Sequence, residues 1–381
     1  MNLLPFSLLF GLALTICTAQ DNFTASIDFL RTHMPLQDRE TITEKRLGKE
    51  VRFALTAREQ FPWAKQVPWE IYANNVLPYA VVNEPRDEWR EQFYKTFAPI
   101  VSSCKTGQEA ALAIASSIQD ILNVRYSTER RVPHQGVKES LQSGKVSCTG
   151  QSILLICALR SVGIPARMAG VLTWNHVRGN HNWTEAWCDG EWKMLEYNEK
   201  TFNTPWVLSA ISMLDPNKPE NTIYATSWKK ESYKKDFFPL IWEARYDPIK
   251  HTLTFPPESK IVPAVNITDR YLKLASEWVA AQPSYVPGSR LMLNIQTKTK
   301  NGIKRLPLHV TLKSEDGEVL ADGTTPGPTD DIRKFLEITL PRRISHGVLE
   351  LMLPDGTVRI EPVAHTKAPI QILNLFITIP E

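Results

Sequence analysis

The pattern of apolar and polar residues predicts a buried helix near the middle of the chain. Residues 151–162, QSILLICALRSV, are apolar on nearly every face and consist of good helix formers. A helix without a polar face belongs inside a core rather than on a surface. Gly163 and Pro165 follow it, and both residue types are common where helices end. The helix therefore begins close to Cys148.

The segments that follow this helix read as strands. Residues 166–174 form an apolar run, and residues 181–188 and 191–198 alternate between apolar and polar positions. Asp189-Gly190 lies between the last two segments and is a strong signal for a two-residue hairpin turn. The turn predicts an antiparallel pair of strands and also sets their register.

Helical spacing of apolar residues extends over the N-terminal part of the chain. Residues 20–100 predict several helices separated by prolines, and residues 107–126 predict one long amphipathic helix. The segment 126–144 that follows is polar and typical of a loop. It directly precedes Cys148, so it is either one wall of a cleft or a solvated loop.

From about residue 250 the pattern changes to short strands separated by Gly, Pro and Asp-Gly turns. This spacing is typical of a small antiparallel β-sandwich. The chain is therefore predicted to be an α+β protein with a helical N-terminal region and a C-terminal β-sandwich-like accessory domain. The predicted divisions are a signal peptide at 1–19, the N-terminal helical region at 20–100, the central core at 101–248 and the C-terminal domain at 249–381.

Residues 1–19 form an apolar run that ends in Cys17-Thr18-Ala19, a plausible cleavage site for a signal peptide. The run is short for a transmembrane helix and lacks charged flanks, so we expect export rather than a membrane span. Cys17 also allows lipid anchoring, which is the weaker interpretation because Ile16 is bulky for a lipidation site. The expected location is periplasmic or extracellular.

Composition narrows the possible partners. Of the 381 residues, 43% are hydrophobic and 22% are charged, as in ordinary globular proteins, and the length predicts two or three domains. The net charge of +3 is close to balanced and argues against a nucleic-acid or membrane-surface partner. The sequence contains no phosphate loop and no metal-ligand spacing, so we expect neither a cofactor nor a metal.

Cys148 is the candidate nucleophile because it lies at the predicted start of the buried helix. Backbone N–H groups and the positive end of the helix dipole gather there, and both favour a thiolate. The same N–H groups are suited to hold an oxyanion. The alternative is that Cys148 is a small buried hydrophobic residue, which is what cysteine usually is. Cys157, within the apolar run, fits that alternative better.

His181 and an acid on the next strand complete the candidate set. The hairpin register places His181 opposite Asn198 and Trp183 opposite Glu196, so all four side chains share one face. Glu196 is the predicted orienting acid, and Asn198 is the second choice. A bulge in the hairpin would bring Glu199 to this face instead.

The cysteine count is consistent with a free thiol. After removal of the leader, the chain would retain Cys104, Cys148, Cys157 and Cys188. A nucleophilic Cys148 leaves three cysteines, which allows one internal disulfide at most. Cys188 lies on the face of its strand that points away from His181, so we expect it to belong to the packing.

Taken together, these motifs resemble the transglutaminase-like superfamily, the papain-related group that includes the peptide N-glycanases. The resemblance covers roughly residues 25–245. The family usually has aspartate at the position of Glu196, so this residue departs from the pattern. The segments that carry the resemblance are the turn Gly144–Gly150, Gly163–Arg167, the His181-x-Trp183-x-Glu185 strand, the Trp192 to Glu196 spacing, and the upstream stretches at 76–80 and 83–90.

The resemblance implies a papain-like fold at residues 101–248 and an exported thiol enzyme with Cys148, His181 and Glu196 as its triad. Its substrate would be a peptide, protein or glycopeptide, and the thioester would be resolved by water or by an amine. His176 and Arg178 are candidate substrate contacts from their position before the histidine strand. The competing hypothesis is a non-catalytic surface or binding protein that keeps the fold.

Overall fold

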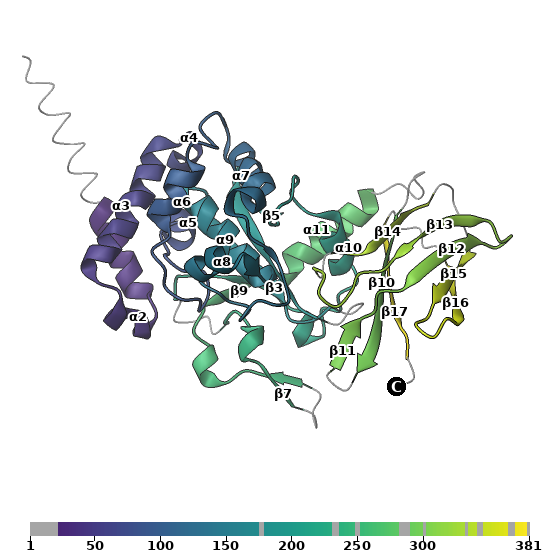
Figure 1. Cartoon of the computed structure of the whole chain (residues 1–381). Helices are drawn as coiled ribbons and strands as arrows, with labels where there is room; N and C mark the ends of the chain where they lie inside the picture. Colours follow the sequence, from purple (N-terminus) through teal and green to yellow (C-terminus); the bar gives the residue numbers. More distant parts are fainter. Residues whose placement is uncertain are drawn as a thin grey trace, which may run out of the picture.

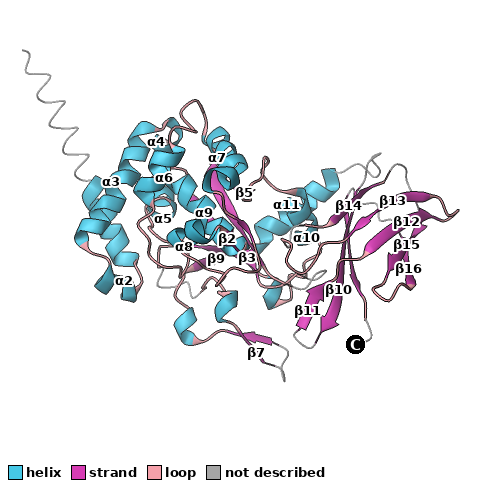
Figure 2. Ribbon diagram, viewed as in Figure 1, coloured by secondary structure: helices cyan, strands magenta, loops and turns pink. Residues whose placement is uncertain are grey.

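The computed structural model combines helices and sheets, which confirms the α+β prediction (Figures 1 and 2). The predicted leader at 1–19 and the loop residues His176 and Arg178 lie outside the described residues. No helix within the described ranges combines the length and the apolar character of a membrane span. The described residues are 22–174, 179–230, 236–247, 252–281, 290–299, 302–331, 334–340, 346–364 and 370–378.

Helices make up the N-terminal part, and threonine caps begin the longer ones. Thr43 and Thr106 accept hydrogen bonds from backbone N–H groups in the first turns of α3 and α7. Asn123 ends α7 in a left-handed conformation at φ 52°. The helices are residues 22–33, α2 (Leu36–Thr41), α3 (Glu44–Gln60), α4 (Pro62–Lys65), α5 (Trp69–Asn75), α6 (Arg90–Phe97) and α7 (Gly107–Leu122).

The prediction that α7 extends to residue 126 is wrong. Arg125–Tyr126 form a short strand, β1, which pairs in parallel with β2 (Lys145–Val146) directly before Cys148. The left-handed turn at Asn123 redirects the chain, and the pairing satisfies backbone groups that a longer helix would have used. The pair brings Tyr126 next to the start of the following helix.

The core is a five-stranded antiparallel sheet covered on both faces, in the order β5-β4-β3-β6-β9. Helix α9 packs on one face, with α6 and α7 against it, and α10 and α11 pack on the other. The elements are α8 (Val137–Ser143), α9 (Cys148–Ser161), β3 (Ala166–Val171), β4 (His181–Cys188), β5 (Glu191–Leu195), α10 (Pro205–Ile211), β6 (Ile223–Thr226), β7 (Arg245–Asp247), β8 (Thr252–Thr254), β9 (Ala264–Asn266) and α11 (Thr268–Ala281), with 3-10 turns at Pro219–Asn221, Ile241–Glu243 and Pro257–Ser259.

The hairpin has the predicted turn and register. Asp189 and Gly190 have φ values of 56° and 85°, as a type I′ turn requires, and Thr184 pairs with Leu195. Strand β5 ends at Leu195, three residues earlier than predicted. Asn198 has a φ of 63° and turns the chain away from the sheet.

The C-terminal region consists of two four-stranded sheets around a separate apolar core. The prediction of a purely antiparallel sandwich is wrong in one pair, because β17 runs parallel to β10. The hydrophobic pattern sets which residues are buried but not the direction of a strand. The strands are β10 (Arg290–Thr299), β11 (Gly302–Arg305), β12 (His309–Ser314), β13 (Val319–Thr324), β14 (Leu336–Thr339), β15 (His346–Met352), β16 (Val358–Ala364) and β17 (Ile370–Phe376).

Candidate active site

Cys148 is the first residue of α9, as predicted. Ser147 is the N-cap: its Oγ accepts from the N–H of Gly150 at 3.1 Å and donates to the carbonyl of Pro133 at 2.7 Å. The N–H groups of Cys148 and Thr149 therefore remain without an acceptor inside the helix. Cys148 as a whole residue is half-buried.

His181 is the first residue of β4, and its side chain is 1% exposed. Its Nε2 lies 2.7 Å from Oε1 of Glu196. An ionised carboxylate only accepts hydrogen bonds, so Nε2 carries a proton and donates it. Nδ1 makes no hydrogen bond of standard geometry, and the ring interacts instead with the Cys148 thiol, which shifts the pKa of both groups.

Asn182 ties β4 to the first turn of α9, although the two segments are far apart in sequence. Its backbone N–H interacts with the sulfur of Cys148, and its Nδ2 donates to Oγ1 of Thr149 at 2.9 Å. Its carbonyl accepts from Oγ of Ser152 at 3.2 Å. These contacts fix the position of the sulfur relative to the strand that carries the imidazole.

Gly170 makes room for this connection. It pairs with Asn182 across β3 and β4, and a Cβ at residue 170 would lie 2.1 Å from Oδ1 of Asn182. Any larger residue would displace the amide that reaches Thr149. Gly170 therefore belongs to the packing that positions Cys148.

Glu196, rather than Asn198 or Glu199, is the acid in contact with the imidazole. Its side chain is 3% exposed and lies directly after the end of β5. Asn198 is exposed and in a left-handed conformation, and the N–H of Glu199 donates to the carbonyl of Glu196 at 3.3 Å in a turn. The structure thus brings together Cys148, His181 and Glu196.

Trp206, on α10, is a site residue that sequence reasoning did not single out. Its Nε1 donates to Oε2 of Glu196 at 3.0 Å, and its ring lies 5.1 Å from that of His181. The indole therefore holds the carboxylate oxygen that the imidazole leaves free. The sequence does show Pro205-Trp206 at a helix start shortly after Glu196. That pattern does not indicate that the indole of Trp206 would contact Glu196 and His181.

The pKa values of the pair move toward an ion pair. Burial disfavours a charge on Cys148, but the hydrogen bond and the charge of His181 outweigh it and lower the pKa of the thiol. Burial also disfavours a charge on His181, but Cys148 and Glu196 together raise the pKa of the imidazole to about 9. Both shifts favour a thiolate next to an imidazolium.

Glu185, the acid in the strand that carries His181, belongs to a buried network next to the site. It is completely buried and contacts Arg167 at 2.8 Å, Arg270 and the hydroxyl of Tyr271. Tyr271 accepts from Nε1 of Trp183 at 2.8 Å. The ring of Trp183 lies 5.9 Å from that of His181, so this network supports the imidazole indirectly.

The other three cysteines have different surroundings. Cys157 and Cys188 are buried in the main core, and Cys104 is half-buried. All four cysteines in the described ranges are free, so none of them forms the disulfide that the sequence allowed. The prediction that Cys157 and Cys188 belong to packing is confirmed.

The prediction that residues 126–144 are a loop is wrong for Val137–Ser143, which form α8, and the segment as a whole has structural contacts. Besides accepting from Ser147 through Pro133, it forms the Arg131–Glu139 ion pair and stacks His134 on Trp242 with ring centres 5.0 Å apart. It therefore supports the N-cap of α9 rather than remaining a solvated loop.

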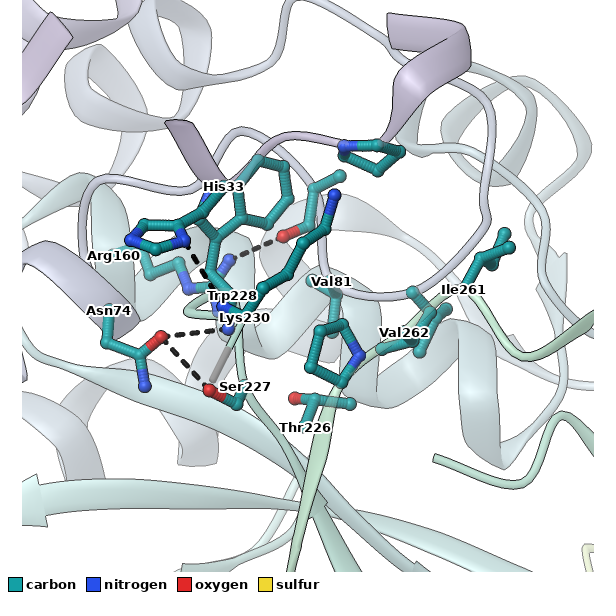
Figure 3. A pocket seen from close by; sticks show the side chains of 14 residues that line it. His33, Asn74, Val81, Arg160, Thr226, Ser227, Trp228, Lys230, Ile261 and Val262 are labelled. Atoms are coloured by element: carbon teal, nitrogen blue, oxygen red, sulfur yellow. Dashed lines mark hydrogen bonds between the residues drawn. The ribbon is translucent and has the colours of Figure 1, made fainter. Parts of the chain in front are cut away.

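A separate pocket lies between the N-terminal helices and the segments around β6 and β9 (Figure 3). His33, Arg160, Trp228 and Lys230 line it, and Oδ1 of Asn74 accepts from the N–H groups of Trp228 and Lys229 at 2.8 Å each. The volume open to the centre of a water molecule is only about 20 Å³. That space holds about one water, so the pocket does not compete with Cys148 as a substrate site.

A family model of the transglutaminase-like superfamily matches residues 95–196, a range that contains Cys148, His181 and Glu196. A search of curated proteins found no match. Three solved structures are similar in part.

A candidate cysteine protease from Cytophaga hutchinsonii is 16% identical over 37% of this chain and 46% of its own, with a TM-score of 0.30. A candidate protease from Parabacteroides distasonis is 12% identical over 47% of this chain and 29% of its own, with a TM-score of 0.26. Red sea bream transglutaminase is 9% identical over 80% of this chain and 64% of its own, with a TM-score of 0.37. The chain spans less than two thirds of each.

Proposed function

We propose that this chain, whose residues 95–196 match the family model of the transglutaminase-like superfamily, is an exported cysteine enzyme that cleaves or transfers the acyl group of an amide or peptide bond. One observation carries the proposal. A buried imidazole contacts the thiol at the start of a helix on one side and a buried carboxylate on the other. This is the geometry that an activated nucleophile needs.

In the first half of the reaction, the thiolate of Cys148 attacks the carbonyl carbon of the substrate. The carbonyl oxygen becomes an oxyanion, for which the N–H groups of Cys148 and Thr149 are the donors in place. The C–N bond then breaks, and the imidazolium of His181 gives its proton to the leaving amine. A thioester and a neutral imidazole remain.

In the second half, His181 takes a proton from the incoming nucleophile. Water yields a carboxylic acid, and an amine yields a new amide. The C–S bond breaks, and the thiolate and imidazolium are restored. Glu196 keeps Nε2 protonated and the ring oriented throughout, as the acid does in other triads.

We propose a peptide, protein or glycopeptide as the substrate. The site itself is compatible with hydrolysis and with transfer to an amine. A library of peptides and glycopeptides, incubated with and without an added primary amine, separates these outcomes. Mass spectrometry of the products would show free acids, amine conjugates or released glycans.

Thiol labelling tests whether the site is catalytic or belongs to a non-catalytic binding protein. Iodoacetamide at pH 5 to 8 should modify Cys148 faster than Cys104, Cys157 or Cys188. Cys148→Ser should abolish turnover, and His181→Ala should remove the difference in labelling. Equal labelling of all four cysteines would support the binding protein instead.

A further inference from the structure

A cavity distinct from the pocket in Figure 3 opens beside the turn of the β4–β5 hairpin. Its volume is about 330 Å³, which falls in the range of roughly 300 to 1,000 Å³ that is typical of small-molecule sites. Four segments line it: the loop after α4, the first residue of α7, the turn between α9 and β3, and the end of the hairpin. The cavity is therefore built by elements of the core and of the N-terminal helices.

This cavity is remote from the proposed nucleophile. Cys148 is the first residue of α9, whereas Ile164 and Pro165, which line the cavity, follow the end of that helix. His181 likewise begins β4, and Cys188, at the other end of the strand, lines the cavity. Helix α9 has 14 residues, and at a rise of about 1.5 Å per residue it separates the two sites by roughly 20 Å. The cavity therefore cannot hold the bond that Cys148 attacks.

Two indole rings line the cavity, and both are held by other residues. Trp63 is buried; its ring stacks on Phe61 with ring centres 4.8 Å apart, and its Nε1 donates to the carbonyl of Val162 at 3.0 Å. Trp187 is half-buried, and its ring meets that of Trp192 edge to face at 5.4 Å. Because these neighbours do not themselves line the cavity, the indoles are in place before any ligand arrives, which lowers the cost of binding.

The rim of the cavity is polar but carries no excess of either charge. Gln66 and Asp189 are exposed lining residues; the amide both donates and accepts hydrogen bonds, and the carboxylate accepts them. Nζ of Lys193 lies 3.9 Å from Asp189 and 3.2 Å from Glu191, and the exposed Lys65 precedes Gln66 in the chain. Two acids and two lysines therefore balance beside the rim, so a neutral ligand with hydroxyl groups fits it better than an ion.

We propose that this cavity binds a neutral sugar ring of an oligosaccharide. The C–H face of such a ring is apolar and packs on an indole, and its hydroxyl groups both donate and accept hydrogen bonds. The ring packs on Trp187, and its hydroxyls reach Gln66 and Asp189. An apolar side chain of a peptide would use the indoles but not the polar rim. The inference concerns a site remote from the thiol, so it does not depend on the proposed reaction.

Calorimetric titration of the full chain with maltotriose, cellotriose and N,N′,N″-triacetylchitotriose tests the proposal with neutral sugars that differ in linkage and substituents. At least one should bind with one molecule per chain, and the complex should show slower amide hydrogen exchange in residues 66–68 and 187–190. Cys148→Ser should bind the same sugar equally well. Failure of all the sugars to bind, or slower exchange only elsewhere in the chain, would overturn the assignment.

Trp187→Ala tests whether the indole is the surface on which the sugar packs. The affinity for the sugar that binds should fall about tenfold or more, because the apolar contact with the ring is lost. Trp278→Ala is the matched control, since Trp278 is also a half-buried indole but lies on α11 and does not line the cavity. Equal losses of affinity in the two variants would show that the sugar does not bind at Trp187.

Asp189→Asn tests the polar rim. The affinity should fall about threefold, because a charged acceptor becomes a neutral one while an Asn-Gly pair still supports the hairpin turn. Asp355→Asn, in the Asp355-Gly356 turn of the C-terminal domain, is the control and should leave the affinity unchanged. An unchanged affinity in Asp189→Asn would overturn the role of the carboxylate in binding the sugar.

The same titration with a proline-rich peptide and a tryptophan-containing peptide separates the sugar site from a peptide site, since aromatic-lined grooves also bind peptides. A peptide that binds and loses affinity in Trp187→Ala, with no sugar binding, would show that the sugar assignment is wrong. The proposed enzyme fails separately. A Cys148 that reacts no faster than Cys104 leaves the sugar site intact, and a hyperreactive Cys148 without sugar binding leaves the enzyme intact.

Discussion

Helix α9 carries two cysteines whose surroundings are opposite. Cys148 at its start is half-buried, and contact with His181 lowers the pKa of its thiol. Cys157 in its middle is fully buried in the main core, and burial raises the pKa of its thiol well above the ordinary value. The same residue type on one helix is thus a candidate nucleophile at one position and packing at the other.

The two thiols differ in pKa because the start and the middle of α9 have different neighbours. The start of α9 meets β4, where Asn182 contacts the sulfur and His181 supplies a charge. Cys157, in the middle of α9, lies within the main apolar core. A thiolate needs a positive partner and free N–H groups, and only the start of the helix provides both.

The largest expected effect is that of removing the imidazole. Without His181, burial raises the pKa of the Cys148 thiol and only the backbone N–H of Asn182 still lowers it, so Cys148 should become far less reactive. In His181→Ala, we expect the alkylation rate at pH 7 to fall about 100-fold and turnover by about 1000-fold or more. His346→Ala, at an exposed histidine on β15, is the control and should retain both rates. An unchanged alkylation rate at Cys148 in His181→Ala would contradict the claim that His181 makes Cys148 more reactive than Cys157.

Glu196→Gln should have the next largest effect, about 100-fold on kcat. The carboxylate raises the pKa of His181, so its loss should also move the alkaline limb of the pH profile to lower pH. Glu199→Gln sharpens the assignment, because the hairpin register left Glu199 as an alternative. Loss of activity in Glu199→Gln with activity retained in Glu196→Gln would reverse the roles.

Gly170→Ala should weaken the site without touching any member of the triad. The new Cβ would displace Asn182 from Thr149 and loosen the position of the sulfur. We expect kcat and the Cys148 alkylation rate to fall together, by about tenfold. Gly48→Ala on α3, where a Cβ meets only ordinary contacts at 3.4 Å and beyond, is the control. Unchanged kinetics in Gly170→Ala would mean that Asn182 does not position the nucleophile.

Cys157→Ala should affect stability alone. Removing a buried sulfur leaves a small cavity, so we expect the free energy of unfolding to fall by about 1 to 2 kcal/mol in urea denaturation. Both kcat and the labelling of Cys148 should stay at the level of the unmodified protein. A change in either would show that the middle of α9 is coupled to its start.

Sequence reasoning worked where local signals decide the structure. The run around Cys157 predicted a buried helix, and the turn at Asp189 and Gly190 set a register that places Glu196 near His181. It failed where long-range contacts decide. Neither the direction of β17 nor the meeting of Trp206 and Phe335 has a signature in local periodicity, because each depends on how distant segments pack.

The central claim is that Cys148 and His181 form an ion pair near neutral pH, and the pH dependence of alkylation tests it most directly. The iodoacetamide rate at each cysteine would be measured between pH 4 and 10 by peptide mass spectrometry. Because the pKa of Cys148 is lowered, its rate should rise at lower pH than that of Cys104. It should change again near pH 9, where His181 loses its proton. A single rise at Cys148 at the same pH as at Cys104 or higher would contradict the account.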